Sequence, residues 1–511
     1  MFKKVIKDTS ILGLGTFISR VLGFIRDILL AKFFGTSSIF EAFIVAFRLP
    51  NLFRSMFAEG FADSVATPVL SGYQKDKFKI FEIGNYLISL FLIILFIFTL
   101  LGIVFSKYLV LIIAPGFINQ AYKYSLAVSF TRLTFIYLFL IGLSTNITSV
   151  LYSLKKFFIP AVTPAFLNIS FIVGILFFSR FFEKYILVIC VLVAGLLQII
   201  FPLISLKREG FHLRFSFYKS FKDMVIIKML KLFIPRIWSS IIYHLSVFVD
   251  TIFSSLTHIV GQGALAAIYY ANRLIQFPLA LIALSISRVA IVDLSGYYQE
   301  GNIDGFKRLL VFSFQNIIFF VIPISVIFIF LPQGIIDVLF TRGEFDLSSL
   351  SITSSVLFFY SFGLFFFCAI KLLVNSFYSL KDTFTPAKTA TVSLIVNIIL
   401  SAILMFPLKV GGVALGSSLA AILNFLLLYQ NLIKKIGHIQ WGDTKAQFIK
   451  VIILSLIIGF ISRSLWSVLF LHRYFKMLII LVFIFIIFVT GSSIMGLKQM
   501  DYIKKWILKK K

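Results

Sequence analysis

Residues 82–106 read EIGNYLISLFLIILFIFTLLGIVFS, and this stretch decides the fold class. It contains no charged side chain after Glu82 and is long enough for one α-helix to cross the hydrocarbon core of a bilayer. The whole chain has the same character, because 60% of its 511 residues are hydrophobic and only 13% are charged. Soluble proteins are about 45–50% apolar and about 25% charged. The composition therefore excludes a soluble protein.

Similar apolar stretches recur along the chain and predict an all-α polytopic membrane protein with fourteen transmembrane helices. The predicted spans are 9–34, 39–72, 82–106, 124–153, 160–179, 185–206, 229–257, 264–296, 309–331, 347–380, 385–406, 412–433, 447–470 and 474–496. An even number of spans puts both termini on one side of the membrane. The segments on that side carry most of the Lys and Arg, including Lys75, Lys77, Lys155, Lys156 and Lys219, so we expect cytoplasmic termini.

This topology explains the net charge of +28, which comes from 48 Lys and Arg against 20 Asp and Glu. Basic loops orient the chain and contact anionic lipid on the cytoplasmic face, so nucleic acid is not expected as a partner. The two cysteines, Cys190 and Cys368, lie in apolar stretches, which excludes a disulfide framework or a CxxC metal site.

The sequence resembles itself at a shift of about 225 residues. The YSLK of residues 152–155 recurs at 378–381, and the Pro-Ala of 160–161 recurs at 386–387 with the same internal spacing. Each repeat would hold six spans in the same orientation, which favours two lobes that open alternately to the two sides of the membrane. The predicted domains are an N-terminal lobe at 1–215, a C-terminal lobe at 216–437 and two additional helices at 438–511.

Charged side chains inside the predicted spans are the exception. An Arg at the centre of a bilayer costs about 2.5–3.5 kcal/mol on insertion scales, so it faces a partner or a polar cavity. The charged residues of spans 9–34, 39–72 and 264–296 include Arg20, Arg26, Asp27, Glu41, Arg48, Arg54, Glu59, Asp63 and Arg273. One interpretation is that they form internal ion pairs between helices. Cations are in excess, however, which favours an anionic, phosphorylated ligand that the Arg fork binds through two hydrogen bonds.

Helical geometry constrains the pairing of these charges only in part. Arg20 and Asp27 are seven residues apart and share one stripe of a helix, while Arg26 projects about 120° away from Arg20. Asp27 cannot neutralise both arginines. In span 229–257, Asp250 lies among apolar residues and predicts either a cation or proton site or a partner for an arginine.

At these residues the sequence resembles the MurJ (MviN) family of lipid II flippases, in the multidrug/oligosaccharidyl-lipid/polysaccharide exporter superfamily. The matching motifs are SRVLGFIRD at 19–27, FRLPNLFR at 47–54, FAEG at 57–60, APGF at 114–117, YYANRL at 269–274 and LFTRGEFD at 339–346. The resemblance extends from the first predicted helix to the last. It implies two six-helix lobes followed by two C-terminal helices whose groove holds the undecaprenyl tail.

The resemblance implies that a central cationic cavity binds the pyrophosphate and head group of lipid II, an undecaprenyl-pyrophosphate-linked disaccharide-peptide. The family's essential arginines match Arg20, Arg26, Arg54 and Arg273, and its cavity acids match Asp27, Glu41 and Glu59. Glu41 stands where many members have Asp, Asn272 replaces a common Asp, and Ser55 replaces a second Arg. The implied function is to flip lipid II from the cytoplasmic to the periplasmic leaflet of the bacterial inner membrane, in support of peptidoglycan synthesis.

Some family members have a sodium site, whose positions fall on Asp250, Asn397, Ser401, Val413 and Ser417. Ser401 stands where an acid is expected, so this site would have one carboxylate together with amide, hydroxyl and carbonyl oxygens. The other interpretation is that Asn397 and the serines are small interhelical contacts. A sodium gradient or the membrane potential would give transport its direction, and no other cofactor is expected.

Other functions remain open at this point. The chain could export another polyprenyl-linked saccharide, or amphipathic drugs, although a drug exporter would favour acids over arginines in its cavity. A membrane glycosyltransferase would carry clustered acids on a loop, but the longest loops, near 207–228 and 332–346, offer only Glu344 and Asp346 as an acidic pair, which we expect to cap a loop. A scaffold for the cell-wall synthesis machinery would leave the intramembrane arginines unexplained. No GxxxxGK[ST] motif occurs, so the chain shows no sign of ATP hydrolysis. We therefore expect a secondary-type transporter and not an enzyme.

Overall fold

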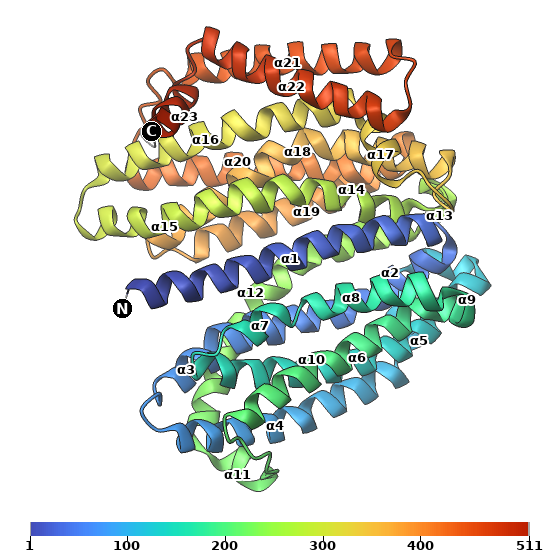
Figure 1. The fold of residues 1–511 in the computed structure, drawn as a ribbon, viewed down its shortest axis with the longest axis vertical. Coiled ribbons are helices and arrows are strands. Elements are labelled where there is room, and N and C mark those ends of the chain that lie inside the picture. The colour runs from blue at the N-terminus through green and yellow to red at the C-terminus, as the bar shows by residue number, and fades with distance from the viewer. Residues whose placement is uncertain (1, 509–511) are drawn as a thin grey trace. The chain divides into compact units, whose positions relative to one another are not determined.

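The computed structural model describes residues 2–508 of the chain (Figure 1). Side chains are described within this range except at 2–16, 57–59, 63, 234–244, 503 and 506–508. The described residues form helices joined by turns and contain no β-strand, which confirms the predicted all-α membrane fold. Contacts divide the chain into two compact units, Met1–Ser255 and Leu256–Lys511.

The first unit is arranged around α6, against which α2, α4 and α10 all pack. Its elements are α1 (Phe2–Phe34), α2 (Ser38–Ser55), η1 (Met56–Ala66), α3 (Thr67–Ser71), α4 (Lys77–Val104), α5 (Ser106–Ile113), η2 (Pro115–Asn119), α6 (Ala121–Ser153), α7 (Phe158–Val162), α8 (Ala165–Val173), η3 (Gly174–Phe178), α9 (Ser179–Phe182), η4 (Glu183–Tyr185), α10 (Ile186–Arg208), α11 (Phe217–Lys222) and α12 (Met224–Ser255). Phe61, Leu87, Phe91 and Phe135 lie in its hydrophobic core.

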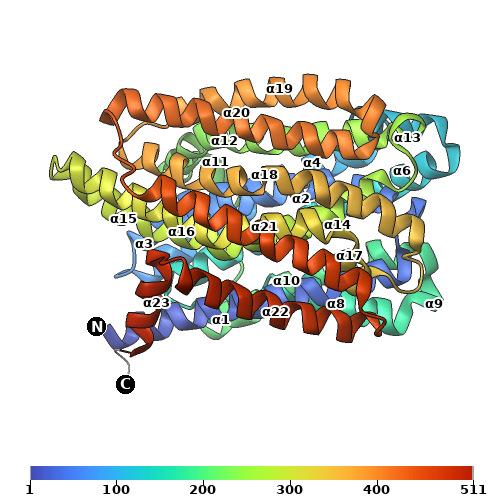
Figure 2. The same cartoon turned by 90° about the horizontal axis from the view of Figure 1, so that it is seen from above.

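The second unit is arranged around α18, which packs against α14, α15, α16 and α20. Its elements are α13 (Thr257–Val260), α14 (Ala264–Pro278), η5 (Leu279–Ala283), α15 (Leu284–Gln299), α16 (Ile303–Phe330), α17 (Pro332–Phe340), α18 (Leu347–Ser379), α19 (Phe384–Leu408), α20 (Val410–Ile436), α21 (Thr444–Val468), α22 (Arg473–Ile494) and α23 (Lys498–Leu508). The C-terminal helices are added at the outside of this unit, where α21 packs on α16 and α22 packs on α21 (Figure 2).

Ten helices in the described part of the chain are long and apolar enough to cross a membrane. One of them, Ala165–Arg208, covers the two predicted spans 160–179 and 185–206. The predicted spans 9–34, 39–72 and 229–257 lie on α1, on α2 to α3 and on α12, which are helical but are not among the ten. The count of fourteen therefore stays a prediction.

The two units repeat the same series of helices. α4 and α16 each have 28 residues, and α6 and α18 each have 33. Just after α6 and α18, Lys155 and Lys381 have positive φ of 60° and 58° and lie 226 residues apart (381 − 155). Glu183 and Lys409, also 226 residues apart (409 − 183), have φ of 43° and 53°. Positive φ is uncommon outside glycine, so its recurrence at one offset supports the internal repeat.

The boundaries of the predicted domains agree with the internal repeat but differ from those of the two contact units. The predicted domains are 1–215, 216–437 and 438–511. By contacts, α12 belongs to the first unit, where it packs against η1 and α4, and the last three helices belong to the second unit. The division into three domains stays a prediction.

Candidate functional site

Arg26 and Asp27 form an ion pair on α1, inside the first unit. The Arg26 Nη2 and Nε atoms donate to Asp27 Oδ1 at 2.7 and 3.0 Å, and the two residues are only 9% and 3% exposed. Adjacent residues on a helix point about 100° apart, so the long Arg side chain must fold back to reach its neighbour. Asp27 therefore forms its ion pair with Arg26, although the seven-residue spacing places Asp27 on the same side of the helix as Arg20.

Asn168 on α8 joins this pair and was missed by the sequence analysis. Its Oδ1 accepts a hydrogen bond of 3.0 Å from Arg26 Nη1, and its Nδ2 donates to the backbone carbonyl of Ser19 at 2.8 Å. Asn168 thus links α8 to α1 at two points and leaves little of its amide unsatisfied. The available sequence signal was an amide within the apolar span 160–179, which marks a polar contact but not its partner.

Arg20 and Arg54 differ from Arg26, because no described carboxylate forms an ion pair with either of them. Arg20 is exposed on α1. Arg54 is half-buried near the end of α2, and its Nε donates to Asn51 Oδ1 at 3.0 Å within the same helix. The side chain of the predicted cavity acid Glu59 lies outside the described residues, as does that of Asp63.

Glu41, another predicted cavity acid, lies in the interior of the first unit. Its carboxylate on α2 forms an ion pair with Lys123 of α6, and both side chains are 1% exposed. The Lys123 ammonium also lies 4.4 Å from the centre of the Phe117 ring, which belongs to the APGF motif. Lys123 was missed because it lies at the edge of a predicted span, where a lysine is typical of a loop.

Arg273 lies on α14 of the second unit beside an aromatic side chain. Its guanidinium is 4.7 Å from the centre of the Tyr269 ring, and its Nη2 donates to the Tyr269 hydroxyl at 3.1 Å. An arginine over a tyrosine face gains a cation–π interaction, and the hydrogen bond fixes its direction. Tyr269 therefore orients Arg273 within the YYANRL motif.

Four of the five predicted ion-site residues converge in the second unit. The hydroxyls of Ser401 and Ser417 donate to Asn397 Oδ1 at 3.0 and 3.3 Å, and the Ser401 hydroxyl is 3.5 Å from the Val413 carbonyl oxygen. These neutral oxygens fit a weak alkali-cation site only if a carboxylate adds charge. The fifth residue, Asp250, lies on α12 of the first unit.

The same four residues also fit close helix packing. A side chain added at Gly416 would meet the Ser401 hydroxyl at 2.4 Å, so α19 and α20 approach each other closely here. Small residues with interhelical hydrogen bonds are typical of membrane helix contacts. No group of three or more His, Cys, Asp or Glu suited to a metal occurs among the described residues.

The LFTRGEFD motif joins two helices. Arg342 Nη2 donates to the carbonyls of Val338 and Leu339 at 2.8 Å, which caps the end of α17. Asp346 begins α18 as its N-cap, and the backbone N–H of Ser349 donates to its carboxylate at 2.8 Å, which lowers the pKa of Asp346. Asp346 is therefore the N-cap of α18, whereas the sequence predicted only that the pair Glu344 and Asp346 caps a loop.

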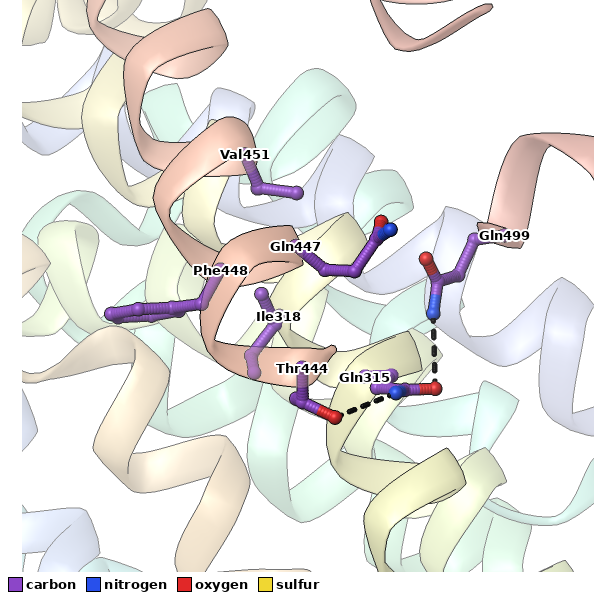
Figure 3. A pocket seen from close by; sticks show the side chains of 7 residues that line it. All are labelled: Gln315, Ile318, Thr444, Gln447, Phe448, Val451 and Gln499. Carbon is purple, nitrogen blue, oxygen red and sulfur yellow. Dashed lines mark hydrogen bonds between the residues drawn. The ribbon is translucent and has the colours of Figure 1, made fainter. Parts of the chain in front are cut away.

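A pocket at one end of the C-terminal helices is lined by amides and not by cations. Figure 3 shows Gln315, Gln447 and Gln499 on α16, α21 and α23 around it. Gln315 Nε2 donates to Thr444 Oγ1 at 2.7 Å, and Gln499 Nε2 lies 3.5 Å from Gln315 Oε1 (Figure 3). The other lining residues are Ile318, Phe448 and Val451, so the lining has no charge with which to bind a phosphate.

The sequence profile of the family described as lipid II flippase MurJ matches residues 30–488. The chain belongs to the lipid II flippase MurJ family. A protein of Buchnera aphidicola subsp. Schizaphis graminum described as a probable lipid II flippase MurJ is 33% identical over 99% of this chain and 100% of its own length. A protein of Vibrio cholerae serotype O1 with the same description is 31% identical over 84% of this chain and 83% of its own.

Solved structures agree with this membership. A lipid II flippase MurJ in an inward closed conformation matches with a TM-score of 0.78 and 26% identity, over 94% of this chain and 98% of its own. An inward-facing multidrug resistance MATE family transporter of the MOP superfamily has a TM-score of 0.64 and 14% identity, over 82% and 95% of the two chains. The MATE match shows a shared fold. Together the matches identify a membrane transporter of the MurJ family.

Proposed function

We propose that this protein flips lipid II from the cytoplasmic to the periplasmic leaflet of the bacterial inner membrane by alternating access. Its membership of the MurJ family supports this function, because relatives along nearly the whole chain are described as lipid II flippases. Both termini would lie in the cytoplasm, since the basic segments are concentrated on that side in the predicted topology.

The observation that carries the proposal is that arginines within predicted spans lack carboxylate partners. Arg20 and Arg54 have no carboxylate within ion-pair distance among the described residues, although they lie on helices of predicted spans. A cation in such a place is costly unless an anion visits it. The pyrophosphate of lipid II supplies that anion, and its oxygens match the two parallel N–H groups of a guanidinium.

Arg26 in the first unit and Arg273 in the second would each offer the ligand a guanidinium whose direction is fixed in advance. Asp27 and Asn168 hold the Arg26 guanidinium, and Tyr269 holds that of Arg273. Side chains that are already oriented lose less conformational freedom when a ligand arrives. The lipid tail would stay in the membrane, along the C-terminal helices, while the head group crosses through the protein.

Direction would come from the membrane potential or from a sodium ion. The candidate residues for sodium are Asp250 in the first unit, and Asn397, Ser401, Ser417 and the Val413 carbonyl in the second. A bound sodium ion would supply a positive charge whose release depends on the open side of the protein. Asp250 would then carry the only formal charge among these five positions. Moving one elementary charge through 100 mV gains about 2.3 kcal/mol.

The test is the distribution of lipid II between leaflets. Cells depleted of the protein should accumulate lipid II in the cytoplasmic leaflet, and wild-type protein should restore export. Arg54→Ala and Arg273→Ala at normal protein levels should not restore it, whereas Arg308→Ala, which changes an exposed arginine of α16 outside the predicted spans, serves as the matched control. Full translocation by Arg54→Ala and Arg273→Ala would exclude the arginine site, and an unchanged lipid II distribution after depletion would exclude the function.

A further inference from the structure

The segment between α10 and α12 is fixed to the first unit through its backbone. We call residues 211–224 the α11 strap; it contains α11 and lies beside one end of α4 (Figure 1). Asn85 of α4 donates to the His212 carbonyl at 3.1 Å and accepts from the Arg214 N–H at 2.9 Å. The N–H of Ser216 donates to Ser89 Oγ at 3.0 Å. These bonds hold the strap in place and leave most of its side chains free to contact something else.

The outward face of the strap is apolar and mostly aromatic. Phe215, Tyr218, Phe221 and Met224 are 53%, 72%, 57% and 76% exposed. The Phe215 and Phe217 rings are stacked, with their centres 6.0 Å apart and their planes 3° from parallel. Several large exposed apolar side chains within one short segment are typical of a surface that meets a membrane or a partner.

Basic side chains alternate with these aromatic residues. Arg214, Lys219 and Lys222 are all exposed, and none of them forms an ion pair with a described residue. Lys222 lies over the Tyr218 ring, 4.1 Å from its centre. The acid of the strap, Asp223, accepts from the N–H groups of Val225 and Ile226 at 2.9 and 3.1 Å, so it caps α12 and does not neutralise the lysines.

We propose that the α11 strap lies in the head-group layer of the cytoplasmic leaflet and binds anionic phospholipid. Arg214, Lys219 and Lys222 would bind the lipid phosphates, while Phe215, Tyr218 and Phe221 enter the boundary between head groups and acyl chains. Aromatic side chains concentrate at this depth of a bilayer, and basic segments beside membrane helices bind anionic lipid. This inference rests on the cytoplasmic orientation in the proposed function.

Chain continuity favours a membrane over a soluble protein partner. α10, which belongs to an apolar spanning segment, ends at Arg208, and α12 begins at Met224, so a short connection must return along the membrane surface. The strap also carries the N-cap of α12. Lipid bound to the strap would therefore fix the depth at which α12, the helix of Asp250, begins.

Spin labels test where the strap lies. The full chain, with the buried Cys190 and Cys368 replaced by Ala, would carry Tyr218→Cys or Phe221→Cys in vesicles of phosphatidylglycerol and phosphatidylcholine. Labels at both positions should be more accessible to oxygen than to a water-soluble nickel chelate. A label at Glu300→Cys, an exposed position after α15, should show the reverse. If labels at 218 and 221 behave like the label at 300, the strap lies in water and the proposal is overturned in favour of a soluble partner.

A second experiment tests whether the basic side chains of the strap bind lipid phosphates. Native mass spectrometry of the purified chain should find several-fold less bound phosphatidylglycerol in Arg214→Gln/Lys219→Gln/Lys222→Gln than in the wild type. The control Lys107→Gln/Arg180→Gln/Lys409→Gln also removes one exposed arginine and two exposed lysines, from segments predicted on the opposite side of the membrane, and should retain the lipid. If both triple variants retain equal amounts of phosphatidylglycerol, the strap is not the lipid-binding site and the proposal is overturned.

Neither readout uses lipid II, so the two proposals can fail separately. A strap variant that loses phosphatidylglycerol but still flips lipid II leaves the proposed function intact. Loss of flipping in Arg54→Ala with normal phosphatidylglycerol binding leaves the strap intact.

Discussion

Residues that are charged and buried need both a counter-charge and hydrogen bonds, and the first unit provides these in two ways. Arg26 is held by its neighbour Asp27 and by the amide of Asn168, at a place where α1 meets α8. Glu41 and Lys123 instead face each other across α2 and α6 with almost no exposure. The first arrangement orients an arginine, and the second ties two helices together.

Asn168 should contribute both to stability and to transport. We expect Asn168→Ala to lower the free energy of unfolding by about 1.5–3 kcal/mol, because a hydrogen bond to a charged group is lost. Lipid II flipping should fall with it, since Arg26 loses its orientation. Chemical unfolding in detergent and a flipping assay measure the two effects. Asn316→Ala is the control, because the Asn316 amide donates within its own helix to Phe312; equal effects of the two variants would contradict this role.

The Glu41–Lys123 pair should behave as a coupled unit. Lys123→Met alone should cost about 3–5 kcal/mol, because it leaves an uncompensated carboxylate in the interior. Glu41→Gln/Lys123→Met removes both charges and should recover most of that loss. Melting temperatures of the single and double variants measure the coupling. Asp443→Asn, which breaks the exposed pair with Lys498, should change little; a double variant as unstable as Lys123→Met would disprove the coupling.

The sequence predicted which residues are charged within the spans but not their partners. A charge in an apolar stretch is visible in the sequence because it costs free energy in a bilayer. Its partner depends on how helices pack, and Asn168 and Lys123 lie 142 and 82 residues from the groups they bind. The partner of Asp27 was unresolved because helical periodicity does not describe a long side chain that folds back.

At the scale of elements, the two repeats use the same ion pair with its charges reversed. Lys156 pairs with Glu209 at 2.7 Å in the first unit, and Asp382 pairs with Lys435 at 2.5 Å in the second. Both positions are related by the same offset, because 382 − 156 and 435 − 209 both equal 226. Each pair joins the turn after the central helix, α6 or α18, to the end of α10 or α20. The fold therefore requires opposite charges at these two positions, but either position can carry the positive charge.

Exchanging the charges in the first unit should therefore be tolerated. Lys156→Asp or Glu209→Lys alone should destabilise the protein by at most about 1 kcal/mol, since the pair is partly exposed. Lys156→Asp/Glu209→Lys should recover most of the loss, except for repulsion between the new lysine and Lys77, which also contacts Glu209. A double-mutant cycle on melting temperature, repeated at high salt to screen the pair, measures this. Additive losses in the cycle would contradict the shared role.

Asp382 makes the stability of the second unit depend on pH. Burial alone would raise the pKa of Asp382, but hydrogen bonds from Lys435 and Thr385 outweigh burial and lower it to about 2. Since this pKa lies below the value of about 3.9 in an unfolded chain, the stabilisation is present above pH 4 and is lost as the pH falls toward 2. Wild type and Asp382→Asn should thus differ in melting temperature at pH 7 and converge at low pH. A difference that stayed constant with pH would contradict this assignment.

Elements made of one uninterrupted apolar run were predicted within a few residues. The span predicted at 82–106 is α4 at Lys77–Val104, and its start is set by the Asp76 N-cap. The span predicted at 39–72 is divided into α2, η1 and α3, with π-helical geometry from Met56. Hydropathy does not distinguish a π-helix from an α-helix, because both satisfy the backbone within the segment.

At the scale of the whole molecule, the internal repeat and the family motifs were sufficient to predict an all-α transporter. Both depend on local sequence: turn residues such as Lys155 and Lys381 occupy the same positive-φ position in each repeat. The contact units do not follow the repeat, because α12 belongs to the second repeat in sequence but packs with the first unit. Such an assignment depends on contacts between distant helices.

The net charge that crosses the membrane in one transport cycle should determine whether the membrane potential drives export. Lipid II carries a negatively charged pyrophosphate outward, so an inside-negative potential should speed export. One net charge moved through 100 mV is worth about 2.3 kcal/mol, or about 50-fold in an equilibrium constant. Outward movement of fluorescent lipid II in vesicles should therefore rise steeply as a potassium diffusion potential is increased in sodium-free buffer.

The role of Asp250 can be separated from this response in the same vesicles. A sodium gradient should add to the rate in the wild type, and Asp250→Asn should abolish that addition while it keeps the response to potential, because the substrate still carries its charge. Ser401→Asp, which introduces a carboxylate beside Asn397, should strengthen the sodium effect. A rate that stays flat between zero potential and about −100 mV would mean that arginine movement cancels the pyrophosphate charge. A sodium effect that survives Asp250→Asn would remove Asp250 from the coupling mechanism.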